Sequence, residues 1–285
     1  MIPEFHYAVG WRTAGLHPGG HVGARFGGGH EFAGHAPFLA HPDPRHLDFR
    51  ASLRDPFGQL LTRTFRQRCS IPVYVLADLS ASMGFRGSAA KLDLLARFAA
   101  ACAYSAYRSG DGFGFIGCDE GIRWELCLPC RFHKGAGPEL EARLKDFTPT
   151  GRSAGGLLEA APHLGKRRAL VFLVSDFHFP LAWAEGLLDA LVRHDVVPVV
   201  VWDSAEYQRL PQFGLVAIED PETGARRRLL MRPALRERFR AAFAARREAL
   251  IRLCAYRGRE PFFLADQFDA DAMTRYFVSG VAPPS

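Results

Sequence analysis

The sequence has no apolar stretch long enough to span a membrane. Its longest apolar runs, residues 169–174 and 196–202, are the length of single strands, whereas a membrane helix needs about 18 apolar residues or more. Residues 1–6 also lack the basic start and the apolar run of a signal peptide. We therefore expect no membrane span and a soluble, cytoplasmic protein.

The signatures of several other protein classes are missing too. The run Gly27-Gly28-Gly29 follows no predicted strand and precedes no Lys-Ser/Thr pair, so it is not a phosphate-binding loop. No Gly-x-Ser-x-Gly segment of a serine hydrolase occurs. The net charge of +6 comes mostly from arginines, whose runs are typical of solvated faces. Because no recognition motif accompanies them, we predict no nucleic-acid partner.

Cysteine is also sparse: six residues in a chain of 285 do not suggest a secreted disulfide framework. Cys127 and Cys130, with His133 nearby, raise the alternatives of a zinc site and a redox site. A zinc site needs about four ligands, and no second cysteine pair at a suitable spacing is present. The pair follows a predicted strand instead of opening a helix, which argues against a thioredoxin-like motif. We favour neither function.

From Ser70 onward, apolar strands alternate with amphipathic helices. Residues 71–77 are β-branched and apolar, as in a buried strand, and residues 91–107 have helical spacing. This alternation predicts a doubly wound, mostly parallel α/β sheet with helices on both faces. Further strands are expected at residues 113–118, 122–128, 169–174, 196–202 and 262–264, a hairpin at 214–218 and 226–231, and helices at 139–147, 155–164, 181–194, 233–256 and 270–277.

The N-terminal part of the chain has a different composition. It is rich in Gly and His up to His41 and shows no long helical or strand periodicity. We interpret residues 1–68 as an extended arm with short strands, and residues 69–285 as the α/β domain. The histidines are irregularly spaced among glycines, which favours a structural role over a metal-binding tract.

One segment joins a buried strand to a group of oxygen-bearing side chains. The strand at residues 71–77 leads directly into Asp78-Leu79-Ser80-Ala81-Ser82. Ligands of an open parallel sheet gather at the carboxyl ends of its strands, and a hard cation such as Mg²⁺ prefers oxygen ligands. Asp78, Ser80 and Ser82 therefore suggest a divalent-cation site. The alternative is that Ser82 caps the helical segment that follows.

Two later segments bring further oxygen atoms to the same edge of the predicted sheet. Asp176 follows the strand at residues 169–174 and so leaves the carboxyl end of a second strand. The loop at residues 148–156 precedes a helix and offers two hydroxyl groups, those of Thr150 and Ser153. We expect the two aspartates to lie close together, with this loop beside them.

The arrangement resembles the metal-ion-dependent adhesion site of von Willebrand factor A-type (vWA) domains, in which one loop reads Asp-x-Ser-x-Ser, a second supplies a Thr and a third an Asp. Ser153 stands where the Thr is usual, with Thr150 as the other candidate. The resemblance implies a vWA-type fold and a site for Mg²⁺, or for Mn²⁺ or Ca²⁺, with Met83, Phe177 and His178 on the partner-binding rim. The implied metal ligands are Asp78, Ser80, Ser82, Ser153 and Asp176.

A second resemblance covers nearly the whole chain, including the turn at residues 220–224 and the helix after Pro233, and its signature lies near the N-terminus. Residues 7–41, 43–52 and 61–68 are similar to the signature of the domain-of-unknown-function-fifty-eight (DUF58) family, with Phe49 in place of a Trp and Pro44 in place of an acidic residue. Members of that family carry a vWA domain and are encoded beside MoxR-type AAA+ ATPases. The short form of this chain is similar to the MxaS-type proteins of methanol-oxidation gene clusters.

The family resemblance implies a partner role. MoxR-type ATPases are thought to mature client proteins or insert their cofactors, and the vWA protein is thought to link ATPase and client. We expect a non-enzymatic, metal-dependent adaptor whose cation binds an acidic residue of the partner, with methanol dehydrogenase as a candidate client. The alternative is a metal-dependent hydrolase in which Asp78 is the nucleophile or Asp176 orients water, with His178 as the base.

Overall fold

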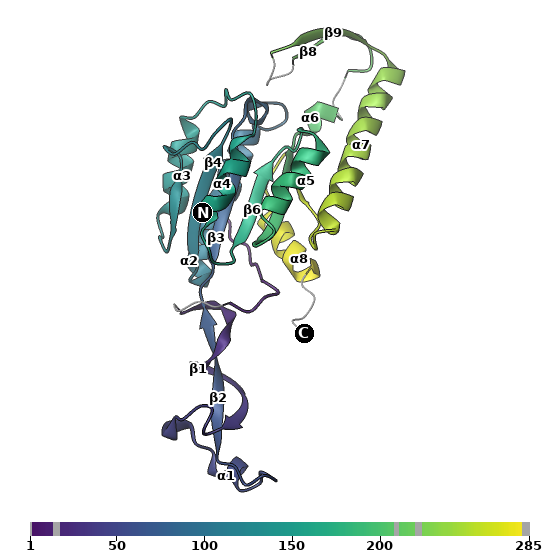
Figure 1. The fold of residues 1–285 in the computed structure, drawn as a ribbon. Helices are drawn as coiled ribbons and strands as arrows, with labels where there is room; N and C mark the ends of the chain where they lie inside the picture. The colour runs from purple at the N-terminus through teal and green to yellow at the C-terminus, as the bar shows by residue number, and fades with distance from the viewer. Residues whose placement is uncertain (1, 14–17, 208–210, 220–223, 281–285) are drawn as a thin grey trace. The chain divides into compact units, whose positions relative to one another are not determined.

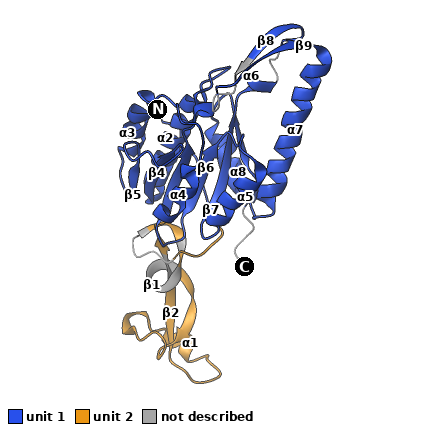
Figure 2. Cartoon of the chain, turned by 45° about the horizontal axis from the view of Figure 1, so that its top comes forward, with its two compact units in different colours: residues 1–8, 72–281 blue, residues 9–71, 282–285 orange. Residues whose placement is uncertain are grey.

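A computed structural model describes residues 2–13, 18–207, 211–219 and 224–280 (Figure 1). The chain forms two compact units (Figure 2), one of residues 1–8 and 72–281 and the other of residues 9–71 and 282–285. The predicted arm of residues 1–68 therefore differs at its start, because the first residues belong to the larger unit. There, Phe5 is 1% exposed and stacks on Phe98 with ring centroids 6.1 Å apart.

The smaller unit is built around an antiparallel hairpin. Strand β1 (Pro18–Pro37) pairs with β2 (Leu61–Cys69), and several register shifts interrupt the ladder. Between the strands lie a 3-10 helix, η1 (Pro44–His46), and a single helical turn, α1 (Phe49–Ser52). Asp48 caps α1 by accepting a hydrogen bond from Ala51 N–H (3.0 Å), and it also accepts one from Arg63 Nε on β2 (2.8 Å).

The larger unit contains a six-stranded sheet in the order β10-β7-β6-β3-β4-β5. Neighbouring strands are parallel except for the antiparallel pair of β4 and β5, which confirms the predicted mostly parallel α/β sheet. The strands are β3 (Pro72–Asp78), β4 (Gly112–Cys118), β5 (Leu128–Arg131), β6 (Leu170–Ser175), β7 (Asp195–Trp202) and β10 (Phe262–Ala265).

Helices cover both faces of this sheet (Figure 1). They are α2 (Lys91–Ser109), α3 (Ala136–Lys145), α4 (Gly156–Ala160), α5 (Leu181–Ala190), α6 (Ser204–Tyr207), α7 (Pro233–Ala255) and α8 (Ala270–Gly280), with 3-10 turns η2 (Ala81–Gly84) and η3 (Ala161–Leu164). Consecutive residues of a strand point to opposite faces. Accordingly, Leu173 of β6 shares one core with Leu157 and Leu187 of α4 and α5, whereas Phe172 packs against Phe98 of α2 (5.4 Å).

The local sequence explains where two of the helices end. α2 stops at Gly110, whose φ of 77° is a left-handed conformation that glycine adopts without steric cost. α4 passes into η3 next to Pro162, which has no N–H group to continue the α-helical hydrogen bonds. The predicted helix at residues 155–164 is therefore a short α-helix followed by a 3-10 turn.

Two expected elements are wrong in extent. The predicted strand at residues 122–128 is mostly a turn, in which Leu126 N–H donates to Arg123 O (2.9 Å) and Cys127 N–H to Trp124 O (3.2 Å). The chain needs this turn to reverse direction between β4 and the antiparallel β5. The predicted helix at residues 181–194 ends at Ala190, because residues 191–193 form turns before β7 begins.

The C-terminal part follows the sequence pattern closely. β8 (Gly214–Glu219) and β9 (Arg226–Met231) form the expected antiparallel hairpin, although residues 220–223 of its turn lie outside the described residues. α7 begins at Pro233, as predicted for a residue tolerated in the first helical turn. Within the described part of the chain, no helix combines the length and the hydropathy needed to cross a membrane.

Candidate functional site

Three neighbouring parallel strands of the larger unit end in or just before an aspartate. Asp78 is the last residue of β3, Asp176 follows β6, and Asp203 follows β7. The register pairs Ala77 of β3 with Val174 of β6, and β7 lies next to β6. The three carboxylates therefore leave the same edge of the sheet. All are buried, with Asp78 and Asp176 each 1% exposed and Asp203 0% exposed.

The Asp78 loop gathers two hydroxyl groups beside the carboxylate. Ser80 N–H donates to Asp78 Oδ1 (2.9 Å), and the Ser175 hydroxyl donates to Asp78 Oδ2 (2.7 Å). The hydroxyl oxygens of Ser80 and Ser82 are 3.3 Å apart, and both residues are buried. Among the described residues, no lysine, arginine or histidine forms an ion pair with Asp78, so hydrogen bonds alone stabilise its charge.

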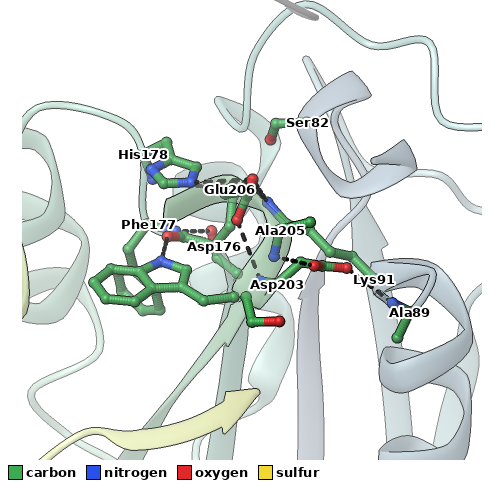
Figure 3. A network of polar contacts seen from close by, with 12 residues as sticks. Ser82, Ala89, Lys91, Asp176, Phe177, His178, Asp203, Ala205 and Glu206 are labelled. Atoms are coloured by element: carbon green, nitrogen blue, oxygen red, sulfur yellow. Dashed lines mark hydrogen bonds and ion pairs between the residues drawn. The ribbon is translucent and has the colours of Figure 1, made fainter. Parts of the chain in front are cut away.

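Asp176 belongs to a network that does contain cations (Figure 3). Its Oδ2 accepts a hydrogen bond from Lys91 Nζ (2.9 Å), and its Oδ1 accepts one from the backbone N–H of His178 (3.2 Å). Lys91 Nζ forms a second ion pair with Glu206 Oε1 (2.7 Å), and His178 Nε2 lies 3.7 Å from the same oxygen. The Trp202 indole N–H donates to the backbone carbonyl of Asp176 (2.8 Å). Ionic and hydrogen-bonded partners thus surround this aspartate.

These surroundings shift the pKa values of Asp78 and Asp176 in opposite directions. Burial and the nearby charge of Asp176 raise the pKa of Asp78 to about 6. Burial also acts to raise the pKa of Asp176, but His178 and Lys91 outweigh it and lower that pKa. For Lys91, burial acts to lower the pKa, but Asp176 and Glu206 outweigh it, so the pKa is raised and the amine stays charged. A further cation near Asp78 would relieve the repulsion between the two carboxylates.

Asp203 holds the segment that leads into α2. Its Oδ1 accepts hydrogen bonds from the backbone N–H groups of Ser88 (2.9 Å) and Ala205 (2.7 Å), and its Oδ2 accepts one from Ala89 N–H (2.9 Å). Hydrogen bonds to an ionised acceptor are stronger than those between neutral groups. Asp203 therefore fixes the start of α2, and with it Lys91, at the carboxyl edge of the sheet.

The loop at residues 148–153 approaches the Asp78 loop through its backbone. Ser80 and Gly151 form a parallel β-bridge, and Ala81 N–H donates to Gly151 O (2.7 Å). A Cβ atom at position 151 would clash with the side chain of Asp119. Glycine at position 151 therefore lets the loop lie close to Asp119 while its backbone pairs with Ser80.

The two candidate hydroxyl groups of that loop lie at the border of the site. Thr150 and Ser153 are exposed, and the Ser153 oxygen accepts a hydrogen bond from Gly155 N–H (3.4 Å). The Ser82 hydroxyl, in contrast, is buried and lies 3.3 Å from that of Ser80. The structure therefore brings together the side chains of Asp78, Ser80, Ser82 and Asp176, whereas Thr150 and Ser153 stand next to this group without a contact to it among those described.

Comparison with known proteins assigns the chain to a family. Residues 41–249 match the family described as "Protein of unknown function DUF58", which is more than half of the 285 residues. The chain belongs to the DUF58 family. An uncharacterized protein of Mycobacterium tuberculosis is 26% identical over 247 residues, which cover 84% of this chain and 75% of the relative. An uncharacterized protein in the moxR 3' region of Paracoccus denitrificans is 37% identical over 101 residues, which cover 35% of this chain and 96% of that protein.

Two of the solved structures with some similarity to this DUF58 chain come from Bacteroides. The conserved hypothetical protein BatB of Bacteroides thetaiotaomicron has a TM-score of 0.42 at 13% identity, covering 74% of this chain and 98% of that chain. An aerotolerance-related membrane protein of Bacteroides fragilis, carrying multiple mutations to serine, has a TM-score of 0.38 at 13% identity with the same coverage.

Two of the three rim residues expected in this DUF58 chain are not at the surface. Met83 and Phe177 are both 0% exposed. Phe177 has a left-handed φ of 53°, and its ring packs against that of Phe179 at 5.4 Å. Because these apolar side chains turn into the core after the strand ends, the rim prediction is wrong for Met83 and Phe177. His178 has a side chain that is 34% exposed and stays a candidate rim residue.

An open hollow of about 580 Å³ borders the Asp78 loop. Its walls are mostly apolar and include one guanidinium group, that of the exposed Arg86. The lining residues are Ala81, Gly84, Phe85, Arg86, Ala90, Leu92, Phe147, Thr148, Pro149 and Ala217.

Lys91 and Glu206 are not among the residues that the sequence pattern predicts for the site. A signal for Lys91 was present, because helical spacing puts it on the same face of α2 as Leu95 and Phe98, and a lysine on a buried face requires a partner. For Glu206 the signal was weaker. It follows Asp203 at the carboxyl end of a third parallel strand, where side chains of a site are expected.

The described residues fit a divalent cation in part. Asp78, Ser80 and Ser82 offer the oxygen atoms that a hard cation prefers. Asp176 fits less directly, because Lys91 already pairs with one of its oxygens. No group of three or more His, Cys, Asp or Glu residues suited to a metal occurs in the described part of the chain. A cation here would therefore depend on the serine hydroxyls.

Proposed function

We propose that this DUF58 protein is a non-enzymatic adaptor that binds a partner protein through a divalent cation at the carboxyl edge of a vWA-type domain. The observation that carries the proposal is the state of Asp78. It is a buried carboxylate beside the hydroxyl groups of Ser80 and Ser82, and no cationic side chain among the described residues pairs with it. Burying an ionised group without a counter-charge is costly, which favours an external cation at this point.

The side chains of the site would have separate roles. Asp78 would supply the negative charge that attracts Mg²⁺, Mn²⁺ or Ca²⁺, and Ser80 and Ser82 would supply neutral oxygen ligands. Asp176 would add negative charge from the neighbouring strand, and Ser153 or Thr150 would add a hydroxyl from the bordering loop. Because most of these ligands are neutral, the bound cation would keep a positive charge and attract an acidic residue of the partner.

The proposed partner is a MoxR-type AAA+ ATPase, which the adaptor would connect to a client protein during maturation or cofactor insertion. The support is that a relative of this chain is encoded in a moxR 3' region. Methanol dehydrogenase is the client that we propose, on the strength of the sequence resemblance to MxaS-type proteins. The apolar hollow with Phe85, Phe147 and Arg86 favours a partner segment in which an acidic residue adjoins an apolar one.

Affinity capture tests this function. The immobilised protein should retain a purified MoxR-type ATPase from the same genome in Mg²⁺, and should release it when a chelator is added. Asp78→Asn should abolish capture and leave the circular dichroism spectrum unchanged. Asp93→Asn, the same change at an exposed position on α2, should capture like the wild type. Equal capture by the Asp78→Asn variant would refute the proposal.

The geometry favours binding over hydrolysis at this site. Asp78 is 1% exposed and both of its oxygens accept hydrogen bonds, so it is poorly placed as a nucleophile. His178, the candidate base, lies 4.0 Å from Asp176 and 3.7 Å from Glu206, and these carboxylates raise its pKa against the effect of burial. Turnover of a generic phosphoester in Mg²⁺ that disappears in the Asp78→Asn variant would support a hydrolase instead.

A further inference from the structure

Lys91 is a fully buried cation at the edge of the sheet where an external cation is proposed. Its side chain is 0% exposed, and its ammonium group lies 2.9 Å from Asp176 Oδ2 and 2.7 Å from Glu206 Oε1 (Figure 3). Removing an ammonium group from water is costly unless acidic partners surround it. Two carboxylates from different elements provide that compensation, one after β6 and one from α6.

The position of Lys91 is fixed from several sides. It is the first residue of α2, and its backbone N–H donates to Phe85 O (3.2 Å). The backbone N–H groups of Ser88 and Ala89, three and two residues before Lys91, donate hydrogen bonds to the carboxylate of Asp203. The ammonium group is therefore held in place by the backbone as well as by its two acidic partners, and it cannot easily leave the edge of the sheet.

Lys91 leaves one of the nearby carboxylates without an ionic partner among the described residues. Asp78, Asp176 and Glu206 are three carboxylates on neighbouring elements, and Lys91 pairs with only two of them. Asp78 is bound by Ser80 N–H and the Ser175 hydroxyl. In a vWA-type site both aspartates would act on one external cation. Here one of the two already has a cation that belongs to the protein.

We infer that Lys91 is a resident cation that competes with the external cation for Asp176, so that Asp78, Ser80 and Ser82 are left to hold the ion with little help. This inference rests on the cation site of the proposed function. The positive charge of Lys91 repels a divalent ion at close range. Lys91 also withdraws the carboxylate of Asp176 from the set of ligands. A site weakened in this way holds its ion firmly only when a partner carboxylate adds negative charge.

Calorimetric titration with manganese chloride near neutral pH tests the inference directly. Lys91→Met removes the charge and keeps an unbranched side chain of similar length. The variant should bind Mn²⁺ more tightly than the wild type, by about tenfold or more. Mn²⁺ should also raise the melting temperature of the Lys91→Met protein further than that of the wild type, because the ion replaces the missing charge beside Asp176.

Two further variants keep the result interpretable. Lys91→Met/Glu206→Gln removes the ion pair as a unit, and it should fold even if the single variant does not, while still binding Mn²⁺ more tightly than the wild type. Arg259→Met breaks a different part-buried pair, with Asp195 (2.6 Å) at the opposite end of β7. This control should lose stability without any change in Mn²⁺ affinity.

The outcomes separate this inference from the proposed function. If the folded Lys91 variants bind Mn²⁺ no more tightly than the wild type, the inference is overturned, and capture of the ATPase in Mg²⁺ still decides the adaptor function independently. If the Lys91 variants bind Mn²⁺ while the wild type does not, the inference stands. In that case Lys91 excludes the ion, and the metal dependence of the proposed function fails.

Discussion

The charged groups at the carboxyl edge of the central sheet are buried and paired through ion pairs or hydrogen bonds, whereas those of strand β9 in the C-terminal hairpin are exposed to solvent. At the sheet edge, Lys91 and Asp176 have side chains that are 0% and 2% exposed, and they are paired at 2.9 Å. On β9, the side chains of Arg227 and Arg228 are exposed. The first group must be paired because it has left water, whereas the second can stay hydrated.

The two regions also differ in how far their charges are balanced by charges of opposite sign. Residues 226–247 carry nine arginines but a single acidic residue, Glu237, so most of their charge is not balanced within the segment. The excess lies on β9 and α7, and α7 buries only Leu250 and Cys254. We conclude that the sheet edge uses charge to fix a structure, whereas exposed arginines such as Arg227 and Arg228 on β9 add to the positive electrostatic field around the protein.

The largest effect should follow from breaking the buried pair. Lys91→Met leaves Asp176 and Glu206 without their shared cation, and the free energy of unfolding without metal should fall by about 3–5 kcal/mol. Urea denaturation followed by circular dichroism measures this loss. Arg228→Met, the matched change at an exposed position, should cost less than about 0.5 kcal/mol. Similar losses for both variants would remove the contrast between the regions.

The sequence predicted the part of the site that depends on strand ends. Asp78 and Asp176 each follow an apolar run, and parallel strands bring their carboxyl ends to one edge, so their meeting required only the strand pattern. The prediction of a strand at residues 122–128 was wrong because most of this segment forms a turn. Apolar periodicity over so short a run does not distinguish a strand from a turn.

Lys91 shows why the rest of the site could not be predicted. Helical spacing reveals that its side chain faces the core, but only tertiary structure reveals which carboxylates meet it there. Those carboxylates belong to Asp176 and Glu206, which lie 85 and 115 positions after Lys91 in the chain. The prediction of the partner-binding rim residues was wrong for a related reason. Met83 and Phe177 adjoin the ligands in sequence, yet their side chains are buried.

A smaller effect, with a distinct pH dependence, should come from Asp203. Burial acts to raise its pKa, but the backbone N–H groups of Ala89, Ser88 and Ala205 outweigh burial and lower it. Its ionised form therefore stabilises the fold fully above the unfolded pKa of about 4, and this contribution is lost as the pH falls through the lower folded pKa. At neutral pH, Asp203→Asn should reduce the free energy of unfolding by about 1–3 kcal/mol.

The measurement for Asp203 is a pair of denaturation series, at neutral pH and at the lowest pH where both proteins stay folded. The difference between wild type and Asp203→Asn should shrink in acid, because protonation makes the two side chains alike in charge. Asp93→Asn, at an exposed position on α2, should show little difference at either pH. A difference for Asp203→Asn that stays constant down to that pH would mean that its charge does not contribute.

The smallest effect on stability should come from the exposed arginines. Arg227→Gln/Arg228→Gln removes two charges that remain hydrated in both the folded and unfolded chain, so the free energy of unfolding should change by less than about 0.5 kcal/mol for each. The double variant should nevertheless elute from a cation-exchange resin at clearly lower salt, since retention depends on the surface field and not on the core. Lys91→Met removes a charge enclosed by two carboxylates and should shift elution much less than either arginine. If the arginine variant lost stability while its elution stayed unchanged, these side chains would be acting as ion-pair partners within the fold, and the two regions would hold their charges by the same means.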